Sequence, residues 1–114
     1  MVQNRNKVIE LFIGNLANSV MHSIIESAIN NEALSERYKK EIATSLDAAK
    51  RYREKINPVE SSLPLKDIGY IKNKITNKVK AELQIRISKG YKNIDLSTVE
   101  KFVDKSLKET YPFS

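Results

Sequence analysis

With 114 residues and a mass of 13.0 kDa, the chain has the size of one domain. Hydrophobic residues make up 40% of it, which is enough for a folded core. The absence of cysteine excludes disulfides, thiolate nucleophiles and cysteine-ligated metals, and the single histidine, His22, excludes a multi-histidine metal site within one chain. We therefore expect neither a metal nor a cofactor.

The most apolar stretch of the chain, residues 8–29, has the features of neither a signal peptide nor a membrane span. Glu10 interrupts its first apolar run, and no small-residue cleavage site follows. Polar side chains such as Asn15, His22 and Glu26 recur through the rest of the stretch. We expect a cytoplasmic protein without a membrane partner.

A first helix is expected over residues 4–29. Ile9, Ile13, Leu16 and Val20 recur at spacings of three and four, the repeat of one helix face. Large apolar side chains widen this face at four further positions, Leu11, Phe12, Met21 and Ile25. A helix that is apolar on most sides either lies at the centre of a fold or pairs with another chain. In the second case these four residues would anchor the interface.

Residues 32–56 and 65–89 are predicted to form the second and third helices, with Pro58 and Pro64 marking the linker between them. Both segments have apolar residues at helical spacing. The expected apolar face of the third helix is Ile68, Ile71, Ile75, Val79, Leu83 and Ile87. Apolar and polar residues also alternate over 83–87, which is a strand pattern, but a lone short strand would lack a partner.

A fourth helix is predicted over residues 97–110. Gly90 suits the left-handed residue just past the end of the third helix. Ser97 and Glu100 match the capping box, in which a hydroxyl and a carboxylate bind the free amides at a helix start. Four amphipathic helices with short connections predict an all-α compact bundle in a single domain, 1–114, with an interwoven homodimer as the alternative.

The net charge of +6 is concentrated in two stretches. Residues 66–92 contain eight basic and two acidic side chains, and residues 37–55 contain seven basic and three acidic side chains. A basic helix can follow a nucleic-acid backbone by neutralising phosphates. Tyr70 and Tyr91 flank the third helix and suit stacking on unpaired bases. The candidate phosphate contacts are Lys72, Lys74, Lys78, Lys80, Arg86 and Lys89, together with Arg51 and Arg53 of the second helix. The alternative is that these side chains only solvate an outer helix face.

A polar stripe crosses the apolar first helix. Asn15, Asn18, His22 and Glu26 recur at spacings of three and four. One interpretation is a general base, with Glu26 orienting the His22 imidazole. The other is a hydrogen-bonded seam that fixes the pairing register of two helices. No nucleophile pattern accompanies the histidine, so we expect no catalytic residue and no enzyme.

Two functional classes follow from these patterns. The first is a small, basic, non-enzymatic protein that binds nucleic acid or a nucleoprotein through its lysine-rich third helix. The second is an assembly or adaptor subunit, homo-oligomeric or part of a larger complex, that has no nucleic-acid role and uses protein–protein contacts of its wide-faced first helix.

Overall fold

A computed structural model describes residues 5–29, 31–56 and 65–110 of the protein. Within these residues it contains helices and no strand, which confirms the predicted all-α fold. The elements are α1 (Arg5–Ala28), α2 (Glu32–Ile56), α3 (Leu65–Ser88), the short 3-10 helix η1 (Leu96–Thr98) and α4 (Val99–Thr110). The predicted linker at 57–64 lies outside the described residues.

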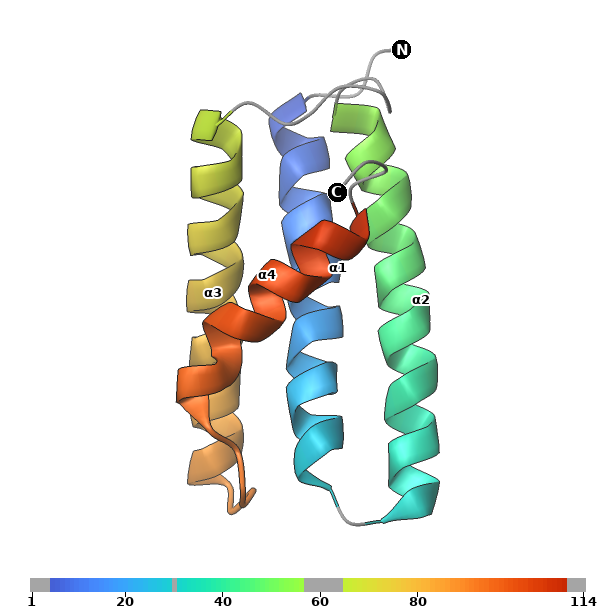
Figure 1. Ribbon diagram of the computed structural model, residues 1–114, viewed down its shortest axis with the longest axis vertical. Helices are drawn as coiled ribbons and strands as arrows, with labels where there is room; N and C mark the ends of the chain where they lie inside the picture. Colours follow the sequence, from blue (N-terminus) through green and yellow to red (C-terminus); the bar gives the residue numbers. More distant parts are fainter. Residues whose placement is uncertain (1–4, 30, 57–64, 111–114) are drawn as a thin grey trace.

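The four α-helices are arranged around α1, which lies between α2 and α3, while the shorter α4 crosses over them on one side (Figure 1). The helix α2 runs antiparallel to α1, and α3 runs parallel to it on the opposite side. The molecule measures 43 × 28 × 24 Å. The helix α4 crosses α1 on one side only. A groove between α1 and α3 also borders α1.

The central position of α1 follows from its composition. Phe12, Leu16 and Val20 are completely buried, and side chains from α2, α3 and α4 join them in one hydrophobic cluster. By length and composition this helix would also suit a membrane span, but 67% of its most apolar window is buried inside the molecule. A helix that is apolar on most sides is stable here because three neighbours cover it.

The apolar face of α3 ends earlier than the sequence predicts. Ile71, Ile75, Val79 and Leu83 are buried, but Ile87 is 39% exposed. Two residues four positions apart are separated by about 400° around the helix axis. A row of residues spaced by four therefore turns around the helix by about 40° at each step. By the last step the row has rotated out of the core. The predicted place of Ile87 in the apolar face is therefore wrong, although the helix itself is confirmed.

The end of α3 has the predicted glycine. Gly90 has a φ of 101°, and its amide donates to the Ile87 carbonyl, while the Tyr91 amide donates to the Arg86 carbonyl. This pair of bonds is the Schellman arrangement, which only a residue tolerating the left-handed region readily completes. The chain therefore turns sharply after α3, and Tyr91 lies back over the last turn of that helix.

The start of the fourth helical segment differs from the prediction. Asp95, rather than Ser97, is the capping residue: its carboxylate accepts hydrogen bonds from the Ser97 amide at 2.9 Å and the Ser97 hydroxyl at 2.6 Å. The capping box predicted from Ser97 and Glu100 is wrong, because η1 is inserted before α4 and moves the first free amides toward Asp95.

Candidate nucleic-acid interface

The lysines of α3 lie on two sides of the helix. Lys72 and Lys80 face α4: the Lys72 ammonium lies 2.9 Å from Asp104, and that of Lys80 lies 4.0 Å from Glu100. The hydrogen bond and the charge of Asp104 raise the pKa of Lys72. These two predicted phosphate contacts already have carboxylate partners, so they are poorly placed to attract a polyanion.

Four other cations make no such contact with a carboxylate of α4, and we call them the basic flank: Lys74, Lys78, Arg86 and Lys89. Within the part of the chain that the structure describes, none of them forms an ion pair. The Lys78 ammonium points toward α1, 4.0 Å from where a Cβ on Gly14 would stand. The Lys74 ammonium lies 5.7 Å from the centre of the Tyr70 ring. Spacings of four and eleven keep Lys74, Lys78 and Lys89 on one face of the helix.

Arg86 belongs to a small cluster at the end of α3. Its guanidinium donates to the Tyr91 hydroxyl at 3.3 Å and lies 5.5 Å from the centre of that ring. The hydrogen bond and the charge of Arg86 lower the pKa of Tyr91. Two causes raise the pKa of Tyr38 on α2: burial, which is the larger, and the neighbouring Tyr91 hydroxyl. The cluster therefore links α2, α3 and the turn after α3.

The second predicted basic cluster, on α2, does not form a surface. Arg51 is exposed, but Arg53 is 1% exposed and is the largest fully buried side chain among the described residues. An arginine lying among core residues cannot reach phosphate. The helical spacing separates the two arginines: Arg53 lies in one row with the buried Ala49 and Ile56, whereas Arg51 lies on the opposite side of α2.

The four predicted interface anchors are mostly used within the chain. Phe12, Met21 and Ile25 are buried, and Leu11 is half-buried. They offer little surface to a second chain in this fold. The largest apolar side chains that are exposed lie elsewhere, at Leu34, Tyr70, Ile85, Ile87 and Tyr91.

The polar stripe of α1 forms a seam with α2. Its cross-helix contacts are Asn18 Nδ2 to Ser45 Oγ at 2.7 Å, His22 Nε2 to Glu41 at 2.8 Å, and Ser35 Oγ to Glu26 at 2.7 Å. Partners later in α1 are earlier in α2, as an antiparallel pair requires. The Asn15 amide donates to the Leu11 carbonyl of its own helix. This geometry agrees with the structural interpretation of the stripe, in which His22 positions helices.

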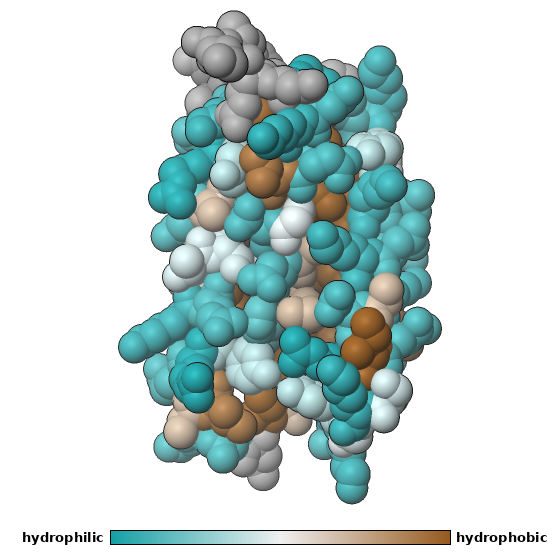
Figure 2. Space-filling view, turned by 180° about the vertical axis from the view of Figure 1, so that it is seen from behind, coloured by the Kyte–Doolittle hydropathy of each residue, from teal (hydrophilic) through white to brown (hydrophobic). Residues whose placement is uncertain are grey.

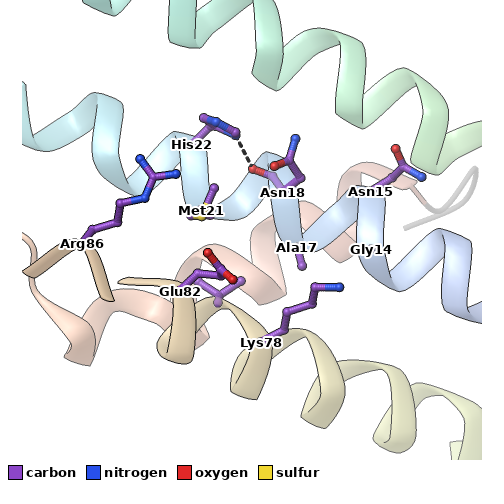
Figure 3. A pocket seen from close by; sticks show the side chains of 10 residues that line it. Gly14, Asn15, Ala17, Asn18, Met21, His22, Lys78, Glu82 and Arg86 are labelled. Carbon is purple, nitrogen blue, oxygen red and sulfur yellow. Dashed lines mark hydrogen bonds between the residues drawn. The ribbon is translucent and has the colours of Figure 1, made fainter. Parts of the chain in front are cut away.

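A groove of about 500 Å³ lies between α1 and α3, beside the basic flank (Figure 3). Gly14, Asn18 and His22 line it from α1, and Lys78, Glu82 and Arg86 line it from α3. A second hollow of about 370 Å³ shares His22 and Arg86 with it and continues toward α2. The face opposite α4 is mainly hydrophilic, with separate hydrophobic spots (Figure 2). This surface suits a charged or polar ligand more than a hydrophobic one.

Among residues 5–29, 31–56 and 65–110, no three histidine, aspartate or glutamate side chains gather as a metal site. The polar groups that line the α1–α3 groove are the amides of Asn15 and Asn18, the His22 imidazole, the Glu82 carboxylate and the cations of Lys78 and Arg86. No protein-family model, no curated protein and no solved structure matches the chain.

Proposed function

We propose that the protein binds nucleic acid, free or in a nucleoprotein, as a non-enzymatic protein that contacts the phosphate backbone through the basic flank. The observation that carries the proposal is the division of the α3 cations: those facing α4 have carboxylate partners, and those of the basic flank have no ion pair in the described part of the chain. Their charge is therefore available to a ligand.

The length of the flank suits a linear polyanion. From Lys74 to Lys89 the helix rises by about 22 Å, which is the length of several phosphates of one strand. Lysine contacts phosphate as a point charge and reads no base, so this binding is expected to depend on salt more than on sequence.

One carboxylate opposes this binding. Glu82 lines the α1–α3 groove between Lys78 and Arg86, one turn from each. It lowers the local positive potential, and we expect moderate affinity that is strongest at low ionic strength.

The test compares two double variants that remove the same charge from the same helix. Lys74→Gln/Lys78→Gln neutralises the basic flank, and Lys72→Gln/Lys80→Gln neutralises the α4 side. We expect fluorescence anisotropy with a labelled oligonucleotide at low salt to show weaker binding for the first variant only, by about tenfold. Equal losses in both variants, or an affinity of the wild type in the millimolar range, would contradict the proposal.

As a second candidate, we propose an assembly subunit whose interface uses Ile85 near the end of α3, which is 46% exposed. A large aliphatic side chain that is exposed on a helix favours a protein contact. Light scattering tests this: a mass of twice the chain that returns to the monomer in Ile85→Ser supports it. A monomeric wild type contradicts self-assembly.

A further inference from the structure

The second hollow lies at the end of the basic flank, where α2 begins and α3 ends. Its lining comes from three helices: His22 of α1, Leu34, Arg37, Tyr38 and Glu41 of α2, and Arg86 of α3. It has a volume of about 370 Å³ and opens to solvent beside the α1–α3 groove. A strand that follows the basic flank toward Lys89 would therefore pass its mouth.

The hollow combines an apolar side with a cationic rim. Leu34 is 43% exposed and Tyr38 is half-buried, so each presents carbon surface to the opening. The His22 ring, with its centre 5.3 Å from that of the Tyr38 ring, supports the tyrosine from inside. Arg37 and Arg86 bring two guanidinium groups from opposite sides.

We propose that this hollow, the base pocket, takes one unpaired nucleobase of a single-stranded nucleic acid, whose flanking phosphates contact Arg37 and Arg86. The proposal rests on the proposed function and narrows its ligand. A planar base stacks on tyrosine or guanidinium groups whatever its identity, and such stacking is sequence-tolerant. In a duplex the bases are paired and stacked inside, so a duplex reaches only the basic flank and leaves the pocket empty.

The wall of the base pocket adds a preference among bases. The carboxylate of Glu41 bonds His22 at 2.8 Å, yet its side chain is 60% exposed. A carboxylate accepts from an exocyclic amino group, such as the 4-amino group of cytosine, and repels the carbonyl oxygen that thymine carries there. Cytosine is therefore favoured over thymine in this position.

The test uses three labelled probes of about 15 nucleotides: single-stranded oligo(dC), single-stranded oligo(dT) and a mixed-sequence duplex. The variant is Leu34→Ser/Arg37→Gln, which changes exposed side chains. The control is Arg51→Gln, which removes the same charge from an exposed site of the same helix outside the pocket. Circular dichroism establishes that each variant folds.

We expect oligo(dC) to bind the wild type more tightly than oligo(dT), and both more tightly than the duplex. Leu34→Ser/Arg37→Gln should weaken single-strand binding about fivefold or more relative to Arg51→Gln and leave duplex binding close to that of the control. Equal affinity for single strand and duplex, or equal losses in variant and control, overturns the base pocket while the proposed function stands. If Lys74→Gln/Lys78→Gln also changes nothing, both proposals are overturned.

Discussion

His22 connects α1 to α2 through its contact with Glu41, and its second ring nitrogen contacts its own helix. Nδ1 lies 2.8 Å from the Asn18 carbonyl oxygen of α1, and Nε2 lies 2.8 Å from the Glu41 carboxylate of α2. The His22–Glu41 contact and the bond from Asn18 to Ser45 fix one antiparallel register of α1 against α2. A shift of either helix by one turn would break both, whereas the apolar contacts alone would tolerate it better.

The first prediction compares the two partners of the His22–Glu41 contact. His22→Ala removes a buried ring and its contact with Glu41 across the two helices, so the free energy of unfolding should fall by about 1–3 kcal/mol. Glu41 is largely exposed, so Glu41→Gln should cost less than about 1 kcal/mol, because solvent screens the pair. Urea unfolding measures both. A loss for Glu41→Gln as large as that for His22→Ala would show that the ion pair, and not the buried ring, is the main contribution.

The second prediction tests the rotation of the apolar row on α3. Leu83 is completely buried, and Leu83→Ala should lower the free energy of unfolding by about 2–5 kcal/mol. Ile87 is the next residue of the row, and Ile87→Ala should change it by less than about 1 kcal/mol because the side chain is exposed. Thermal unfolding of the two variants compares them directly. Similar losses in both would place Ile87 in the core, as the sequence pattern had predicted.

The helices could be predicted because their periodicity is a local property. The three-and-four spacing from Ile9 to Val20 and the break at Gly90 each depend on a few neighbouring residues, and the structure agrees with both. The departure of Ile87 from the core is also local in origin, since it follows from a row spaced by four. The capping residue was missed because the helix begins with a 3-10 turn, which the Ser97–Glu100 spacing does not reveal.

The division of the cations could not be predicted in the same way. Whether Lys72 or Lys74 is available depends on where α4 crosses α3, which is a property of the whole fold. Arg53 differs, because its place in the buried row of Ala49 and Ile56 follows from helical spacing alone. Sequence alone locates the charge on α3; the structure tells which side of the helix has carboxylates opposite it.

The third prediction concerns the cap before α4. The hydroxyl and amide of Ser97 lower the pKa of Asp95 below its ordinary value. The stabilisation by this carboxylate is therefore complete above the ordinary aspartate pKa and is lost as the pH falls through the lowered one. Asp95→Ala should lower the Tm near neutral pH, and the difference from the wild type should narrow at about pH 2.

Circular dichroism at the two pH values measures this effect. Asp95→Asn is the control, because its amide oxygen still accepts a hydrogen bond but does not titrate there. A difference between wild type and Asp95→Ala that stays the same in acid would mean that the charge of the cap does not contribute.

The fourth prediction uses the carboxylate in the groove. Glu82→Gln removes the negative charge between Lys78 and Arg86 without shortening the side chain, so nucleic-acid affinity at low salt should rise by about twofold to tenfold. Asp47→Gln removes a negative charge from an exposed site on α2 and serves as the control for net charge. Affinity that rises equally in both variants would point to a general effect of net charge and away from the basic flank.

The salt dependence of single-strand binding tests the central claim most directly. In a plot of the logarithm of the binding constant against the logarithm of the salt concentration, the slope should be about −0.7 for each phosphate neutralised. Lys74→Gln/Lys78→Gln removes two such contacts and should make the slope shallower by about 1.4, whereas Lys72→Gln/Lys80→Gln should leave it unchanged. Identical slopes for the wild type and both variants would contradict phosphate binding by the basic flank.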